Sequence, residues 1–82
     1  MTPKPLLMSG HAAEKIFKRI GFRFVSQKGS HRKLKRDADK TSGEEERIII
    51  IPNHRELDRW TLKGIIRDSG LTVDEFNKLL RK

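Results

Sequence analysis

The sequence predicts a small α+β domain with the element order αβββαα, in which a three-stranded antiparallel sheet carries helices packed on one face. Three observations lead to this fold class. An apolar pattern with helical spacing opens the chain, two strand-like segments flank a Gly-Ser turn and precede a run of four isoleucines, and two further helical patterns follow. We expect the 82 residues to form one domain, 1–82, with a flexible start at 1–8 and a polar loop at 37–46.

The first helix is predicted over Ser9–Ile20. Ser9 is a suitable N-cap, and Gly21 can adopt the left-handed conformation that often ends a helix. The apolar residues that recur at helical spacing between them are Ala12, Ala13, Ile16, Phe17 and Ile20. Phe22 follows the glycine directly, so we expect it to pack back on Phe17.

Two strands joined by a tight turn come next. Alternating aromatic residues at Phe22 and Phe24 predict a strand with one apolar face as far as Gln27. The tripeptide Lys28-Gly29-Ser30 has turn chemistry, and the segment His31–Arg36 is expected to form the second strand. Together these segments predict a β-hairpin.

The third strand is predicted from four consecutive isoleucines, Ile48–Ile51, which end at Pro52. Because such β-branched runs are typical of strands that are buried on both faces, we expect this strand to be central in the sheet. The preceding segment, 37–46, is polar and contains Thr41-Ser42-Gly43, which predicts a loop.

Two helices complete the predicted fold. The second begins at Thr61 with apolar residues at helical spacing and closes near Gly70, and the third follows a capping-box pair, Thr72 and Glu75. The apolar residues of these helices are Leu62, Ile65, Ile66, Val73, Phe76 and Leu80, and Leu71 and Phe76 are spaced as a hydrophobic staple. Trp60 is expected to pack over the sheet edge or the helix junction, because its large apolar area usually decides its placement.

The formal net charge of +8 is unevenly distributed. Residues 1–36 hold ten Lys or Arg and one acid, Glu14 (net +9), whereas residues 37–82 hold nine Lys or Arg and ten acids (net −1). A field of this kind favours polyanionic partners, either a nucleic acid or an acidic protein surface. A solvated basic face that serves solubility alone is the alternative interpretation.

Composition also limits the compartment, the metal sites and the membrane segments that the protein can have. The chain has no cysteine, so it forms no disulfide and offers no thiolate metal site, in keeping with a reducing compartment. Before Ser9 the only apolar run is Leu6-Leu7-Met8, which is too short for a signal-peptide core or a membrane span. We therefore expect a cytoplasmic protein with no membrane partner.

The tip of the predicted hairpin carries the candidate site. His31 follows Gly29-Ser30 and is surrounded by basic residues that could hold a phosphodiester against its imidazole, a group that titrates near neutrality. We predict His31 as the catalytic residue of RNA cleavage and the following as RNA-binding residues: Lys28, Gly29, Ser30, Arg32, Lys33, Lys35 and Arg36. His54, in the loop after Pro52, is a possible secondary site residue, and a purely structural role for His31 stays open on these grounds.

Other chemistries find little support in the sequence. The histidines lack the i, i+4 pairing of a zinc helix, and the chain has no Gly-rich phosphate loop and no cysteine nucleophile. We therefore expect no metal and no other cofactor. The nucleophile available to such an enzyme is the 2′-hydroxyl of the RNA itself, activated by a general base while lysine or arginine stabilises the developing charge.

Between about Ser9 and Leu80 the sequence resembles the HicA family of toxins. The residues that carry this resemblance are Gly21-Phe22, Gly29-Ser30-His31, Pro52-Asn53-His54, the segment TLKGIIRDSGL at 61–71, and Glu75-Phe76. The resemblance implies a fold like that of double-stranded-RNA-binding domains, an mRNA interferase of a type II toxin–antitoxin system, and a HicB-type antitoxin as partner. It places His31 in the catalytic position. The sequence departs from the family pattern at Trp60, where a glycine usually precedes the threonine.

Two alternatives from other classes stay open. A non-catalytic module on the same fold could bind duplex RNA by its shape, through phosphate and 2′-hydroxyl contacts that need no titrating histidine. A structural domain that binds a partner could instead use the basic strand to match an acidic protein surface. Replacement of His31 separates the first from an enzyme, and RNA degradation on expression would exclude the second.

Overall fold

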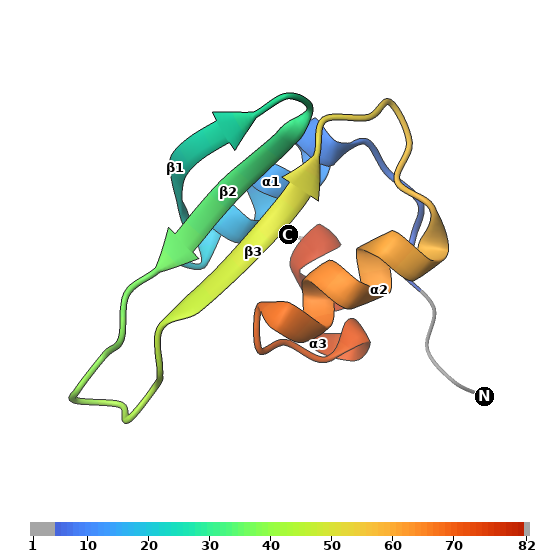
Figure 1. Cartoon of the computed structure of the whole chain (residues 1–82). Helices are drawn as coiled ribbons and strands as arrows, with labels where there is room; N and C mark the ends of the chain where they lie inside the picture. Colours follow the sequence, from blue (N-terminus) through green and yellow to red (C-terminus); the bar gives the residue numbers. More distant parts are fainter. Residues whose placement is uncertain (1–4, 82) are drawn as a thin grey trace.

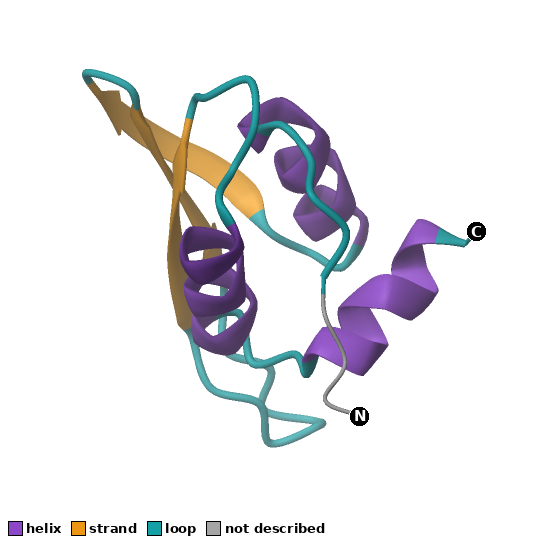
Figure 2. Cartoon of the chain, turned by 90° about the vertical axis from the view of Figure 1, so that its right-hand side faces the viewer, coloured by secondary structure: helices purple, strands orange, loops and turns teal. Residues whose placement is uncertain are grey.

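The computed structural model describes residues 5–81 and shows one open three-stranded sheet with three helices (Figure 1). The elements in chain order are α1 (Gly10–Arg19), β1 (Arg23–Lys28), β2 (His31–Arg36), β3 (Arg47–Pro52), α2 (Arg59–Asp68) and α3 (Val73–Leu80). Figure 2 shows the helices on one side of the sheet. The predicted α+β class and the order αβββαα are confirmed.

Helix α1 begins and ends as its sequence predicts. The Ser9 hydroxyl accepts a hydrogen bond from the Ala12 amide at 3.0 Å, and Gly21 follows the helix with φ of 102°. The Phe22 amide then donates to the Phe17 carbonyl at 3.1 Å, and the two rings meet edge-on with centroids 5.7 Å apart. The predicted return of Phe22 onto the helix is therefore confirmed.

The prediction that the isoleucine strand is central is wrong. The strand order is β1-β2-β3, with both pairs antiparallel, so β2 is central and β3 forms an edge. Ile49 and Ile51 are buried beneath α1 and α2, but Ile48 and Ile50 on the other face are 43% and 44% exposed. An unbroken apolar run does not distinguish one covered face from two, and this chain supplies helices for one face only.

The core lies between the sheet and the helices. Its buried apolar residues are Ala13, Ile16, Phe17, Phe22, Leu34, Ile49, Ile51, Leu57, Leu62, Ile65, Ile66 and Phe76. Phe76 of α3 stacks on Phe17 of α1 with centroids 5.3 Å apart, which connects the two ends of the chain. Met8 packs on this core from the segment before α1, and its carbonyl accepts from the Leu57 amide at 2.7 Å. Residues 1–4 of the expected flexible start lie outside the described residues.

Helix α2 begins two residues before its predicted start. Asp58 is the N-cap, and its carboxylate accepts from the Thr61 amide at 2.8 Å. Trp60 therefore lies in the first helical turn, on the side opposite the buried stripe. It is 85% exposed, with the Lys63 ammonium 5.9 Å from the ring centroid, so the prediction that it packs over the sheet edge or the helix junction is wrong.

Helix α3 has the predicted capping box. The Glu75 amide donates to the Thr72 hydroxyl at 3.1 Å, and the Thr72 amide donates to the Glu75 carboxylate at 2.9 Å.

In the polar segment 37–46, Asp39 and Glu44 exchange two backbone hydrogen bonds of 2.9 and 3.1 Å. No helix within residues 5–81 has the length and apolar character needed to cross a membrane.

Candidate functional site: the open face of the sheet at the hairpin tip

The β1–β2 hairpin ends in a two-residue turn. Lys28 and His31 pair across it, Gly29 has φ of 60°, and Ser30 has a negative φ. This combination is typical of a type II′ turn, whose first central position requires a residue that tolerates positive φ. Glycine meets that requirement without strain. The predicted turn is confirmed, and it places His31 at the first position of β2.

Alternation along β2 divides its side chains between two faces. Leu34 is buried under the helices, so Arg32 and Arg36 project to the same, helix-covered face, while His31, Lys33 and Lys35 project to the open face. The sequence prediction grouped all these cations around His31 as RNA-binding residues. The structure separates them by a whole sheet thickness.

Five residues of the open face form a depression beside the turn. It has a volume of about 560 Å³ and is lined by Ser26, Lys28, His31, Lys33 and Ile50. Ser26 and Ile50 both lie opposite Lys33, on β1 and β3 respectively. The sequence prediction missed these two residues, although strand alternation and a hairpin register set from the turn could have placed Ser26 beside the histidine.

The lysines of the open face differ in their neutralisation. The Lys35 ammonium lies 3.2 Å from a Glu46 carboxylate oxygen and 3.8 Å from one of Asp37. Within the described part of the chain, no carboxylate lies within ion-pair distance of Lys28 or Lys33. Lys28 and Lys33, the described lysines of the open face without an ion pair, both line the depression that holds His31.

Arg32 is bound within the protein on the other face. Its Nε and one terminal nitrogen donate to the two carboxylate oxygens of Glu14 at 2.6 and 3.0 Å, and its guanidinium lies 4.2 Å from the centroid of the Phe24 ring. The bond from Arg32, aided by Lys18, lowers the pKa of the Glu14 carboxyl although burial opposes this shift. Such a bidentate, charge-assisted pair is strong.

Arg36 is held in a similar way farther along β2. Its guanidinium lies 3.5 Å from a Glu44 carboxylate oxygen, 3.4 Å from the Ser69 carbonyl and 5.0 Å from the centroid of the Phe22 ring. Neither Arg36 nor Arg32 lines the depression at His31. The structure thus brings together His31, Lys28 and Lys33 from the predicted set, with Gly29 and Ser30 forming the turn.

The loop that carries His54 supports the hairpin tip through its backbone. The Asn53 amide donates to the Ser30 carbonyl at 2.6 Å, and the His54 carbonyl accepts from the Gly10 amide at 2.9 Å. The His54 side chain is exposed and does not line the depression. Among residues 5–81, no three His, Cys, Asp or Glu side chains are grouped as a metal ion would require.

These features define a class of protein: a small α+β domain with one helix-covered sheet face and one open face, the latter bearing a histidine between uncompensated lysines. Over residues 10–71 the sequence matches the family described as HicA toxin of bacterial toxin-antitoxin. Because the match covers more than half of the chain, the chain belongs to the HicA toxin family, as its sequence resemblance indicated. It is the toxin of a toxin–antitoxin pair, so its partner is an antitoxin. No curated protein matches the chain.

Proposed function

We propose that this toxin is a metal-independent endoribonuclease that cleaves mRNA in the cytoplasm, with His31 as its general acid/base. The observation that carries the proposal is the position of His31 in the open depression between Lys28 and Lys33. An imidazole suits proton transfer near neutral pH, and two uncompensated ammonium groups suit a bound phosphodiester. Membership of a toxin family supports a destructive activity of this kind.

The proposed reaction is attack of an RNA 2′-hydroxyl on the adjacent phosphorus. His31 accepts the hydroxyl proton, the new bond from the 2′-oxygen to phosphorus forms, and the bond from phosphorus to the 5′-oxygen breaks. The leaving oxygen takes a proton from solvent, and the products are a 2′,3′-cyclic phosphate and a 5′-hydroxyl end. Lys28 and Lys33 stabilise the charge that develops on the phosphoryl oxygens.

The open sheet face suits an extended substrate better than a small enclosed one. The depression is bordered by the turn on one side, and Ile50 gives it an apolar wall on β3. Ser26 adds a hydroxyl that can donate to a phosphate oxygen. An RNA strand laid across β1, β2 and β3 would therefore place one phosphodiester beside His31 without entering a deep cavity.

We further propose a HicB-type antitoxin that presents an acidic surface to this open face. Coverage of His31, Lys28 and Lys33 would remove both the attraction for RNA and the access to the imidazole. Hydrogen exchange of the complex tests this proposal, because it predicts protection of β2 and the turn rather than of α3.

The test of the enzymatic proposal compares two histidine substitutions. His31→Ala should reduce RNA cleavage and growth inhibition by at least about a hundredfold, as expected for loss of a general base. His11→Ala, which changes an exposed histidine in the first turn of α1, is the matched control and should leave both unchanged. Circular dichroism checks that both variants are folded. Undiminished cleavage by folded His31→Ala would show that His31 is not catalytic, and RNA binding without cleavage by the wild type would favour the non-catalytic module.

A further inference from the structure

A buried carboxylate lies on α1 where the helix faces the hairpin. Glu14 is only 5% exposed, and among the described residues it is the one acidic residue in the buried set. Its two oxygens accept from the fork of Arg32, and one of them also lies 2.9 Å from the Lys18 ammonium. With two cations as partners and a lowered pKa, Glu14 stays ionised and holds the Arg32 guanidinium in one orientation.

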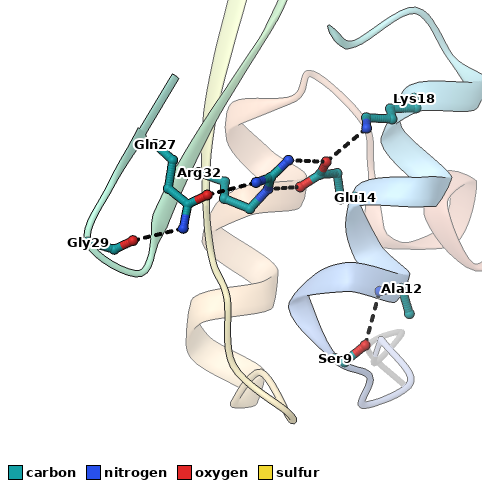
Figure 3. A network of polar contacts seen from close by, with 7 residues as sticks. All are labelled: Ser9, Ala12, Glu14, Lys18, Gln27, Gly29 and Arg32. Carbon is teal, nitrogen blue, oxygen red and sulfur yellow. Dashed lines mark hydrogen bonds and ion pairs between the residues drawn. The ribbon is translucent and has the colours of Figure 1, made fainter. Parts of the chain in front are cut away.

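The oriented guanidinium of Arg32 in turn orients the side chain of Gln27 through a hydrogen bond. A third nitrogen of Arg32 donates to the Gln27 side-chain oxygen at 2.8 Å (Figure 3). Because arginine only donates hydrogen bonds, Gln27 must turn its oxygen toward Arg32 and its amide nitrogen away from it. That nitrogen donates to the Gly29 carbonyl at 2.9 Å. Glu14 thus holds Arg32 in place, and the donor-only guanidinium determines which end of the Gln27 amide faces Gly29.

The Gly29 carbonyl belongs to the central peptide of the turn. Rotation of that peptide plane would convert a type II′ turn into a type I′ turn and would require a positive φ at Ser30. Gln27 holds this plane from one side, and the Asn53 amide holds the next carbonyl, that of Ser30, from the other. Both peptide planes that precede His31 are thus fixed by hydrogen bonds, which fixes the direction of its Cα–Cβ bond.

We propose that Glu14, Arg32 and Gln27 form a positioning relay, which runs from α1 to the turn and orients the His31 imidazole toward the scissile phosphate. The inference rests on the proposed ribonuclease function, and it gives Arg32 a role other than RNA binding. The three residues act through the turn and do not touch the substrate. A displacement of about 1 Å at a reacting group can lower the rate about a hundredfold. A turn held in one conformation keeps the imidazole in its reactive position and so maintains the cleavage rate.

The sharpest test changes the last bond of the relay. Gln27→Glu keeps an acceptor for Arg32 but replaces the donor to the Gly29 carbonyl with a second carboxylate oxygen, and Gln27→Leu removes both bonds. Gln27 is exposed, so neither change creates a cavity in the core. Asp68→Asn is the control, because Asp68 is an exposed carboxylate at the end of α2, 3.4 Å from Arg67, and makes no hydrogen bond or ion pair with the described hairpin.

Two readouts are needed: steady-state cleavage of a short RNA, and ¹⁵N relaxation of the Ser30 and His31 amides. Both Gln27 variants should lose about 10- to 100-fold in kcat with KM for Gln27→Leu within about twofold of wild type. Their Ser30 and His31 order parameters should fall from rigid toward flexible values. Asp68→Asn should change neither kcat nor the order parameters.

The two readouts distinguish failure of the positioning relay from failure of the proposed ribonuclease activity. Unchanged order parameters in both Gln27 variants, or an unchanged kcat in a cleaving enzyme, would overturn the relay. If the wild type cleaves no RNA and the order parameters nevertheless fall, the proposed reaction is wrong, whereas the turn-holding role of the relay is supported.

Discussion

His31, Arg32 and Lys33 are neighbours in sequence, yet the structure places them in two different surroundings. His31 and Lys33 lie in the open depression, whereas Arg32 lies under the sheet against Glu14. The sequence predicted the position of His31 because Gly29-Ser30 determines the turn locally. It did not reveal the partner of Arg32, since Glu14 is 18 residues away and meets it only after α1 packs on the sheet.

The same contrast predicts unequal contributions of two lysines to RNA affinity. Lys33 has no carboxylate partner among residues 5–81, while Lys35 is already paired with Glu46 and Asp37. Lys33→Gln should therefore weaken RNA binding and make its salt dependence shallower by about one released counterion, and Lys35→Gln should have a smaller effect on both. Fluorescence anisotropy at several salt concentrations measures this. Equal losses from the two variants would contradict the assignment of the depression as the phosphate site.

At the scale of elements, the start of α1 meets the end of β3 very closely. The Gly10 amide donates to the His54 carbonyl at 2.9 Å, and a Cβ atom at Gly10 would overlap the Pro52 carbonyl oxygen. This approach fixes the loop 53–54, whose Asn53 amide supports the hairpin tip. Gly10 is therefore needed for the close contact and not for an unusual φ.

Two glycine substitutions test this contact. Gly10→Ala should destabilise the protein by roughly 1–3 kcal/mol, because the helix must move away from β3 and lose a buried hydrogen bond. Gly64→Ala is the control: it lies inside α2 with its nearest neighbouring atom 3.8 Å from the added Cβ, so it should stabilise by roughly 0.5–1 kcal/mol. Urea denaturation of both variants measures the difference. Similar free energies of unfolding would show that α1 and β3 are not in close contact.

The caps and turns, which depend on neighbouring residues, could be predicted from the sequence. The position of each strand in the sheet could be predicted only in part. The caps at Ser9 and Thr72 and the turn at Gly29 follow from neighbouring residues, and the structure confirms them. The edge position of β3 depends on which face the helices cover, a tertiary property that a run of isoleucines does not encode. The N-cap of α2 did have a local signal, because Asp58 is a preferred N-cap residue and lies just before the apolar pattern that begins at Leu62.

The α2 boundary also explains the exposed tryptophan. With the helix starting at Arg59, Trp60 lies two positions before Leu62, which faces the core, and so projects into solvent. A start at Thr61 would have left Trp60 in the loop, where packing over the helix junction was the natural expectation. An error of two residues at a helix start thus reversed the predicted environment of a large side chain.

At the scale of the whole molecule, a single layer of helices leaves half of the sheet surface open. The buried pair of Glu14 and Arg32 connects α1 to the central strand beneath this open face. The pair therefore contributes to the stability of the fold as well as to the position of the turn.

This pair predicts a specific loss of stability in acid. The pKa of Glu14 is lowered in the folded state by the bond from Arg32, so its contribution to stability is present above its ordinary pKa near 4.5 and is lost as pH falls through the lower folded value. Glu14→Gln should cost about 1–3 kcal/mol at neutral pH and should lose less stability than wild type on acidification. Asp58 and Glu75, whose pKa values are lowered by the backbone amides of Thr61 and Thr72, contribute to acid sensitivity in both proteins.

Urea denaturation of wild type and Glu14→Gln between about pH 6 and about pH 3 measures this difference, and the variant serves as the reference for every other carboxylate. Parallel pH profiles for the two proteins would contradict a stabilising charge at Glu14.

A single cleavage experiment decides whether His31 activates the 2′-hydroxyl of bound RNA without a metal ion. Two substrates are used: an RNA, and the same RNA with a single 2′-deoxy residue at the mapped cut. Wild type and His31→Ala are each incubated with each substrate in excess chelator. Wild type is expected to cut only the unmodified bond and to leave a 2′,3′-cyclic phosphate, and His31→Ala is expected to cut neither substrate. Cleavage at the 2′-deoxy position, or loss of all cleavage on chelation, would contradict this mechanism.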